Sequence, residues 1–295
     1  MKKFTILMIL MLSTVLVYSG TSVSANDIIR QINSGKEVVY KNVTIRGDLD
    51  FRKVDDKTLK KEFFNKNKTY TMHVRVPLSF TNCVFEGDVI GYYSDDVDDE
   101  LYNVRFHKDA IFSKSVFKEK AAFKYVKFKE DSNFASCVFD EEALFKYADF
   151  RNEVSFAGSK FNKDANFKYT KFRDKADFTG CKYRRVANYK YTEFSEKAVF
   201  TKCTFNDDAN FKYTKFPETG IFVDSNFVRE ANFKYSKFKR GVTFENVTFG
   251  DDVNFKYTEF SDDVILKNTK FDGDIDSKYA KVNGNSFTKY LLNNR

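Results

Sequence analysis

Bulky apolar residues recur every eleven residues through most of this chain. A second series, offset by five residues, is equally regular, and only Tyr183 replaces phenylalanine in it. The first series starts at Leu101 and continues through Phe112, Phe123, Phe134, Phe145, Phe156, Phe167, Phe178, Tyr189, Phe200, Phe211, Phe222, Phe233, Phe244, Phe255 and Leu266. The second runs through Phe106, Phe117, Phe128 and Phe139 to Phe249, Phe260 and Phe271. A fixed short period indicates one structural unit stacked on copies of itself, so the sequence predicts a solenoid.

The residue types favour β-strands over helices as the repeating unit. Eleven-residue periods can support a right-handed coiled coil, but Phe, Tyr, Thr, Asn and Asp are poor helix formers. The alternating spacing of five and six would also place the phenylalanines on opposed sides of a helix. Short strands with a small residue inward, a polar residue outward and Phe inward fit the pattern. Parallel strands of this kind satisfy their backbone groups through the coils above and below.

Two units of eleven form a larger, double unit. Every second unit resembles the segment from Ala165 to Phe172, whereas the intervening units resemble the segment from Ala176 to Tyr183. The copies of the first type start at Ala121, Ala143, Ala187, Ala209, Ala231 and Val253. If each double unit makes one coil, like residues stack above one another and opposite walls differ. Residues 101–282 then give about eight coils and a rod on the order of 40 Å long.

These units resemble the pentapeptide-repeat family, whose motif is small-polar-(Leu/Phe)-x-x. In Ala165-Asn166-Phe167-Lys168-Tyr169 and Thr170-Lys171-Phe172-Arg173-Asp174, Phe167 and Phe172 match the central inward residue. Ala165 and Thr170 match the inward small residue two places earlier. The resemblance covers roughly residues 80–282 and implies an all-β fold, a right-handed, four-sided parallel β-helix. One extra residue per pair of motifs, such as Lys175, departs from the family's strict fives.

The N-terminal segment, residues 1–25, has the features of a signal peptide. Lys2 and Lys3 form a basic start, residues 6–17 are a mainly apolar run, and Val23-Ser24-Ala25 offers a small-x-small cleavage site. The sequence thus predicts a mature chain from Asn26 to Arg295, secreted or associated with the cell surface, with no membrane span after cleavage. The apolar run is short for a bilayer, and a retained N-terminal anchor is the alternative.

The rest of the chain divides into a regular array with distinct ends. Residues 26–36 are expected to form a helical cap, residues 37–100 irregular coils with surface loops, residues 101–282 the regular solenoid and residues 283–295 a C-terminal cap or tail. Within the irregular part, residues 52–70 read as a charged surface excursion and residues 94–100 as an acidic loop. Caps are expected because an open last coil exposes a strand edge that aggregates.

The four cysteines read as small buried residues. Three of the four cysteines (Cys83, Cys137, Cys181 and Cys203) occupy one repeat position that elsewhere holds Ser115, Ser159, Ser225 or Thr269. A disulfide between Cys181 and Cys203 is the alternative, because the two lie one coil apart and an exported protein can keep disulfides.

The strongest surface feature is a column of Lys-Tyr pairs, one in each double unit. It comprises Lys124, Tyr125, Lys146, Tyr147, Lys168, Tyr169, Lys190, Tyr191, Lys212, Tyr213, Lys234, Tyr235, Lys256, Tyr257, Lys278 and Tyr279. Each pair follows an inward residue, so both side chains should face solvent at a corner. A structural interpretation is duplication of a tolerated pair held by ring stacking and cation–π contact. The functional interpretation is a linear site in which ammonium groups bind anions and aromatic faces bind rings.

Other motifs give weaker signals. The acidic pairs Asp207-Asp208, Asp251-Asp252, Asp262-Asp263 and Asp272 with Asp274 suit corners, with a calcium site as the alternative. The tripeptide Arg46-Gly47-Asp48 fits a turn between strands better than an adhesion motif. Histidine is confined to His73 and His107, without a cysteine or acid at ligand or triad spacing, and no glycine-rich phosphate loop occurs. The sequence therefore predicts no catalytic residues, no metal and no cofactor, and the chain is not expected to be an enzyme.

The net charge and the predicted export limit the kinds of partner that the chain can have. The formal net charge is +8, and it falls to +6 once Lys2 and Lys3 are removed, because residues 1–25 carry no acid. A mildly basic exported chain suits an anionic partner. The prediction is a non-catalytic protein that binds an extended anionic or sugar polymer at the cell envelope. The alternative is a structural scaffold, without a ligand, that self-assembles or forms a homodimer through a coil end. Members of the resembled family that mimic DNA have acidic surfaces, so a nucleic-acid role is not expected.

Overall fold

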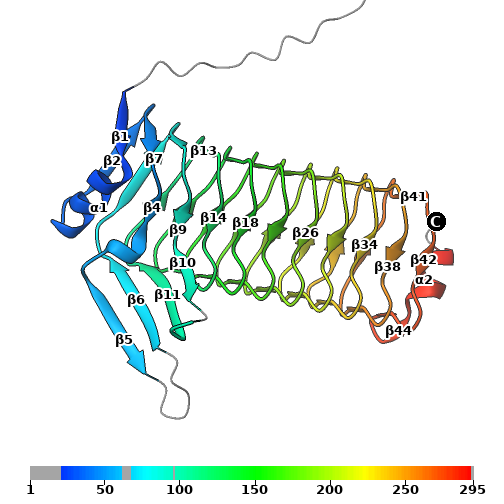
Figure 1. Ribbon diagram of the computed structural model, residues 1–295. Helices are drawn as coiled ribbons and strands as arrows, with labels where there is room; N and C mark the ends of the chain where they lie inside the picture. Colours follow the sequence, from blue (N-terminus) through cyan, green and yellow to red (C-terminus); the bar gives the residue numbers. More distant parts are fainter. Residues whose placement is uncertain (1–20, 62–67, 96, 294–295) are drawn as a thin grey trace, which may run out of the picture.

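The chain forms a four-sided solenoid of parallel strands (Figure 1). The computed structural model describes residues 21–61, 68–95 and 97–293. Four sheets of 11, 10, 10 and 13 strands run along the solenoid. We name them wall A, which ends in β41 (Lys270–Phe271), wall B, which ends in β40 (Val264–Ile265), wall C, which ends in β42 (Ile275–Asp276), and wall D, which carries β43 (Lys281–Val282) near its end. The prediction of a parallel β-solenoid is confirmed.

One coil illustrates the repeating part. It contains β22 (Ala165–Asn166) in wall C, β23 (Lys171–Phe172) in wall D, β24 (Ala176–Asp177) in wall B and β25 (Lys182–Tyr183) in wall A. Each strand pairs in parallel with its equivalent in the next coil, for example Ala165 with Ala187. All strands from β12 (Ala110–Ile111) to β43 have two residues. Neighbouring coils also bond through residues just outside the strands, such as Phe167 N–H to the Asn188 carbonyl at 2.8 Å.

The core consists of interleaved stacks of aromatic rings. Phe156 lies parallel to Phe134 and Phe178, with centroids 5.0 and 5.2 Å away. It meets Phe145 and Phe167 edge to face at 5.1 and 5.3 Å. Both arrangements are favourable for aromatic rings. Each of the two eleven-residue series therefore supplies two ring positions per coil, and the rings stack along the axis and interlock across it.

Two buried tyrosines replace phenylalanines in this core without breaking the pattern. The hydroxyls of Tyr183 and Tyr189 lie 2.7 Å apart, and both side chains are fully buried. Each hydroxyl thus has a hydrogen-bond partner, which a buried polar group requires.

The small inward residues donate side-chain hydrogen bonds to backbone carbonyls of the preceding coil. Thr170 Oγ1 donates to the Phe145 carbonyl at 2.8 Å, and Ser159 Oγ donates to the Phe134 carbonyl at 2.6 Å. Cys137 Sγ fills the same role toward the Phe112 carbonyl at 2.9 Å. All four cysteines are free and buried. They are small buried donors as predicted, and the alternative disulfide between Cys181 and Cys203 is not formed.

The N-terminal end is covered by a helix. Helix α1 (Ala25–Asn33) buries Ile28, Ile29 and Ile32 against the first coil, and the Ser24 hydroxyl accepts a hydrogen bond from Asn26 N–H at its start. Strand β1 (Ser22–Ser24) pairs in parallel with β3 (Thr44–Arg46) at the end of wall A. Residues 1–20 of the predicted leader lie outside the described residues. Its last residues, 22–25, take part in this cap, so cleavage after Ala25 would remove β1 and the helix N-cap.

The first coils carry the remaining irregular elements, which complete the ends of the walls. They are β2 (Val38–Lys41) in wall B, β4 (Leu49–Asp50) in wall C, the 3-10 helix η1 (Phe51–Lys53), β7 (Leu78–Thr81) in wall B, β8 (Val84–Phe85) in wall A and β9 (Val89–Ile90) in wall C.

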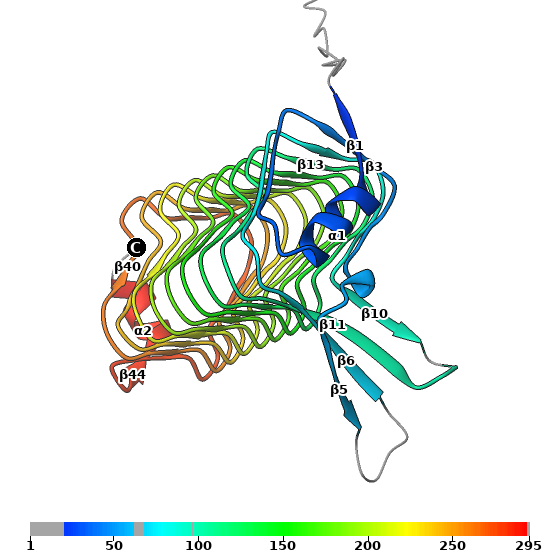
Figure 2. The ribbon, with the colours of Figure 1, turned by 90° about the vertical axis from the view of Figure 1, so that its left-hand side faces the viewer.

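Two hairpins extend wall D into a wing that projects from the solenoid (Figure 2). The wing consists of β5 (Lys57–Lys61), β6 (Lys68–Val74), β11 (Glu100–Phe106) and β10 (Tyr92–Asp95), in this order across the sheet. Residues 57–61 and 68–70 of the expected surface excursion are thus strands, whereas residues 97–99 of the expected acidic loop form a turn. Their charges and rings pair across the sheet: Lys68 bonds Glu100 at 3.0 Å, and the Tyr70 and Tyr102 rings stack at 4.8 Å. Part of the expected excursion, residues 62–67, lies outside the described residues.

The C-terminal end is covered in part. The chain turns from β43 into β44 (Asn285–Ser286), and helix α2 (Phe287–Asn293) follows. Phe287 is buried against Phe255 and Phe260, at 5.5 and 4.7 Å between ring centroids. Neither helix in the described part of the chain is long and apolar enough to cross a membrane.

Candidate functional site

The sixteen predicted residues lie in one line along the corner between walls C and D. We call this line the ladder; it consists of the eight Lys-Tyr pairs from Lys124-Tyr125 to Lys278-Tyr279. Successive tyrosine rings are 4.7 to 4.8 Å apart from Tyr125 to Tyr279. Their planes are within 4° of parallel, except at the last step, where the angle is 20°. The structure therefore brings every predicted member into one continuous stack.

Each ladder tyrosine occupies an unfavourable backbone conformation. Its φ lies between 58° and 63°, in the left-handed region. Residues with a Cβ pay roughly 1–2 kcal/mol for this conformation. The opposite corner, between walls B and A, partly avoids the cost with Gly158, Gly180, Asn246 and Asn268. Tyrosine at all eight positions of one corner indicates that ring stacking offsets the backbone cost or that the side chain is required there.

The asparagine two places before a ladder lysine shapes the same corner. Asn166 Oδ1 accepts a hydrogen bond from Lys168 N–H at 3.2 Å, and Asn188, Asn210 and Asn232 make the same bond at 3.1 Å. This is the local side-chain bond with which asparagine stabilises turns. The recurring Asn-Phe-Lys-Tyr segment thus combines a turn residue, a core ring and the two ladder side chains.

Stacking determines which atoms of the tyrosines are available to a ligand. Neighbouring rings cover both faces of each inner tyrosine, so the faces expected to contact sugar rings are occupied by other tyrosines. Only Tyr279, at the end of the stack, is more than half exposed, at 58 %. The ladder therefore offers ring edges and phenolic hydroxyls along its length.

The ladder lysines carry positive charge without a counter-ion. Each Nζ lies 5.1 to 5.9 Å from the ring centroid of its own tyrosine. Among the described residues, none of the eight forms an ion pair. The neighbouring acids Glu193 and Glu259 pair with cations of wall D: Glu193 with Lys171 and Lys215, and Glu259 with Lys237.

Repulsion between neighbouring ladder lysines contributes to lowered pKa values of their ammonium groups. Loss of hydration lowers the pKa of Lys168, and the adjacent charges of Lys190 and Lys146 lower it further. The same causes, in the same order, lower the pKa of Lys212. An anion placed along the ladder would relieve this repulsion, because it would supply the missing opposite charge.

The N-terminal end of the ladder contains residues that the repeat pattern did not predict. Tyr92 occupies the lysine position one coil before Lys124; its hydroxyl accepts from Lys124 Nζ at 2.8 Å, and its ring lies 5.7 Å from Tyr125. In the coil before that, the Arg52 guanidinium lies 4.1 Å from the Tyr93 ring. The wing lengthens the spacing here to 32 residues. An alignment that allowed this insertion would have shown the relation between Tyr92-Tyr93 and Lys124-Tyr125.

The weaker candidate motifs have structural roles. Asp208 N–H donates to Asp207 Oδ1 at 3.0 Å, and Asp251 and Asp262 cap the following residue in the same way. In the part of the chain that the structure describes, no three His, Cys, Asp or Glu side chains are grouped to hold a metal ion. Asp48 Oδ1 accepts from Asp88 N–H at 3.0 Å, so Arg46-Gly47-Asp48 belongs to a corner.

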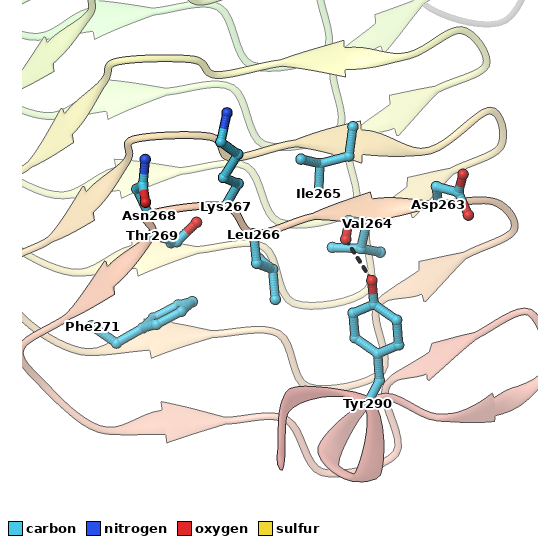
Figure 3. A pocket seen from close by; sticks show the side chains of 9 residues that line it. All are labelled: Asp263, Val264, Ile265, Leu266, Lys267, Asn268, Thr269, Phe271 and Tyr290. Atoms are coloured by element: carbon cyan, nitrogen blue, oxygen red, sulfur yellow. Dashed lines mark hydrogen bonds between the residues drawn. The ribbon is translucent and has the colours of Figure 1, made fainter. Parts of the chain in front are cut away.

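A cavity of about 530 Å³ lies beside the last coil (Figure 3). Leu266, Phe271 and Tyr290 line it, and the Tyr290 hydroxyl donates to the Val264 carbonyl at 2.7 Å. Ile265, at its rim, is 48 % exposed. Helix α2 thus leaves the ends of walls A and B only partly covered.

Substitutions at Tyr191 separate the backbone cost from the stacking. Both Tyr191→Gly and Tyr191→Ala should be less stable than the wild type, since each loses two stacked neighbours, worth about 0.5–1.5 kcal/mol per pair. The glycine variant should be more stable than the alanine variant by about 1 kcal/mol, because only alanine keeps the left-handed penalty. Urea unfolding at 25 °C measures the difference. An alanine variant as stable as the glycine variant would contradict the proposed strain.

Comparison with known proteins identifies the family. The family model described as pentapeptide repeats (9 copies) matches residues 101–149, 123–171, 189–237 and 233–276, which together make up more than half of the chain. No curated protein and no solved structure matches the chain. The chain belongs to the pentapeptide-repeat family.

Proposed function

We propose that this pentapeptide-repeat protein is a non-catalytic scaffold whose ladder binds an extended anionic polymer of the cell envelope. The observation that supports the proposal is the line of eight lysines without ion pairs among the described residues. Like charges in a row are unfavourable for the free protein. Lysines on the adjacent wall D, such as Lys171, Lys215 and Lys237, have acidic partners. If the ladder served only to stabilise the fold, acidic residues beside its lysines would increase that stability.

The geometry of the ladder favours a polymer over a small anion. Coils repeat about every 4.8 Å, so the eight ammonium groups extend over roughly 34 Å. A small anion would meet one or two of them, whereas an extended polyanion would meet all eight. The phenolic hydroxyls beside the lysines add donors for phosphate or carboxylate oxygens.

The place of action follows from the predicted leader. A protein exported through such a leader meets the phosphate-rich or carboxylate-rich polymers of the envelope, and we propose that it is secreted or associated with the cell surface. Contact through charge and hydroxyl groups fits these polyanions better than neutral sugar polymers, because the inner ring faces of the ladder are covered.

The dependence of binding on salt tests the proposal. The protein should bind poly(glycerol phosphate) and poly(glutamate) but not neutral dextran. For a flexible polyanion, the logarithm of the affinity falls with the logarithm of salt with a slope of about 0.7 per charge neutralised, so eight lysines give roughly −5 to −6. Isothermal titration calorimetry from low to physiological salt measures this slope. Binding that is insensitive to salt, or no binding at low salt, would contradict a role for the charged ladder.

A second candidate is supported by the C-terminal end. Strands β40 and β41 are the last of walls B and A, and no further strand pairs with them among the described residues. With the exposed Ile265 and the adjacent cavity, this end fits a scaffold that forms a homodimer through its last coil. Light scattering over a hundredfold range of concentration would give a doubled mass if the candidate is right and a constant monomer mass if it is wrong.

A further inference from the structure

A second group of basic side chains lies on wall D, separate from the ladder. Three consecutive strands form its base: β6, β11 and β15 (Lys127–Phe128). Residues on either side of the inward Val74, Phe106 and Phe128 point outward, because side chains alternate along a strand. The outward residues form a grid of three rows, which we call the basic grid: His73 and Arg75, Arg105 and His107, and Lys127 and Lys129.

The basic grid has more positive charge than its neighbours neutralise. Arg75 bonds Asp56 at 2.5 Å. Arg105, Lys127 and Lys129 form no ion pair with any residue that the structure describes. In the following row, Asp149 is already paired with Arg173 at 2.6 Å and Arg151 at 3.7 Å. The grid therefore keeps three uncompensated cations within two rows.

Arg105 adds an independent sign of a missing partner. Its Nε is buried, and no hydrogen-bond acceptor reaches it. A buried donor of a charged group without an acceptor is costly, and native structures usually satisfy such groups with protein, water or an ion. On the middle strand of the grid, Arg105 is the register partner of His73 on one side and of Lys127 on the other.

The two histidines at this site share a hydrogen bond. His73 Nδ1 lies 3.0 Å from His107 Nε2, and Thr58 Oγ1 lies 3.0 Å from His73 Nε2. Only one proton fits between the two facing nitrogens, so the pair cannot keep this bond when both rings are fully protonated.

Loss of hydration and the surrounding charges both favour the neutral form of the two histidines in the free protein. Loss of hydration, followed by the charges of Lys129 and Arg75, lowers the pKa of His107 to about 4. Loss of hydration also lowers the pKa of His73; Asp56 opposes the change, and Arg105, Arg75 and Lys129 add to it. A bound anion would reverse the balance, because it stabilises imidazolium as well as the three cations.

We propose that the basic grid binds a doubly charged oxyanion, a sulfate or phosphate group, and that binding is coupled to uptake of a proton from solvent by the His73–His107 pair. Rows about 4.8 Å apart surround such a group with donors from three strands. The inference does not depend on the ladder, which follows a different line of the surface.

Sulfate is the probe of choice, since its charge is constant between pH 5.5 and 8. Asp56 also stays ionised in this range, because Arg75 lowers its pKa. At constant ionic strength, we expect sulfate to bind about tenfold more tightly at pH 5.5 than at pH 8. This is the change that one coupled proton produces when the bound anion returns the histidine pKa to its ordinary value of about 6.5. NMR can follow each histidine ring separately, because the chain contains only two histidines. Both ring signals should shift when sulfate is added.

Variants distinguish the site from general attraction to a basic protein. Arg105→Gln and Lys129→Gln should each weaken sulfate binding by about tenfold. The matched control Lys160→Gln, on wall A, should leave it unchanged. His107→Gln should bind sulfate at pH 8 like the wild type and lose most of the gain at pH 5.5. Replacement of four ladder lysines by glutamine should not change the affinity for sulfate. A failure of the polymer proposal can therefore be told apart from a failure of the sulfate proposal.

Two results would overturn the proposal. One is an absence of sulfate-induced shifts of the two histidine signals. The other is equal weakening of sulfate binding by Arg105→Gln and Lys160→Gln. An affinity that does not change between pH 5.5 and pH 8 would overturn the coupling to the histidine pair.

Discussion

Replacement of Phe156 by alanine is expected to lower the free energy of unfolding by about 3–5 kcal/mol, the range for a buried aromatic ring. Phe156 is fully buried and contacts four rings within 5.3 Å. Those rings cannot close the gap, because the backbone of each is held by hydrogen bonds to the next coil, such as Phe134 N–H to the Ser155 carbonyl at 2.7 Å. The variant therefore loses both the buried surface and the contacts around the cavity.

Urea unfolding followed by circular dichroism measures this effect. Phe271→Ala is a suitable control, because Phe271 is only half-buried at the end of the neighbouring stack and contacts the Phe249 ring at 5.1 Å. Its loss should be clearly smaller. Equal losses for the two variants, or a loss below about 1 kcal/mol for Phe156→Ala, would contradict a core of interlocked rings.

Regular parts of the fold could be predicted from the sequence because every coil repeats the same physical requirement. Phe167 and Ala165 must point inward for the same reason as their equivalents in the neighbouring coils, so many positions support one interpretation. The hydrogen-bonding position shared by Cys137 and Ser159 was predictable as well, since only small side chains fit there. The pairing of successive double units then follows directly from the period.

Features that break the period could not be predicted in the same way. The wing joins residues such as Lys68 and Glu100, which are 32 residues apart, and no repeat relates them. The His73–His107 bond likewise spans 34 residues. The strands of an irregular insertion pair with residues that no sequence period relates to them, so their partners are known only from the folded structure.

For the ladder, the sequence predicted the column but not its chemistry. The spacing placed Lys190 and Tyr191 above Lys168 and Tyr169, which the structure bears out. Ring stacking was the structural interpretation of the column, and the rings do stack. The sequence did not indicate that each tyrosine would take a left-handed backbone. Nor did it show that Glu193 would bond Lys171 and Lys215 rather than a ladder lysine, because alternative partners at a corner differ only by side-chain direction.

The second large effect is expected in the affinity of the ladder for a polyanion. Changing Lys168, Lys190, Lys212 and Lys234 to glutamine removes half of the ladder's positive charge. Four contacts of about 0.5–1 kcal/mol each should lower the affinity for poly(glycerol phosphate) by roughly 30- to 900-fold. Stability should change little, because the tyrosine stack remains and the repulsion that lowers the pKa of Lys168 is relieved.

A matched variant controls for net charge. Lys160, Lys182, Lys202 and Lys270 are exposed or half-buried and lie on or beside wall A, and their replacement by glutamine removes the same four charges. A general attraction between a basic protein and a polyanion would be reduced equally in both variants.

The affinity of the two quadruple variants for poly(glycerol phosphate), measured side by side at physiological salt, tests the central claim most directly. If the ladder binds the polymer, the affinity of the ladder variant falls by roughly 30- to 900-fold, and that of the wall A variant stays within about threefold of the wild type. Equal affinities for the two variants would contradict the claim and leave the ladder as a structural stack.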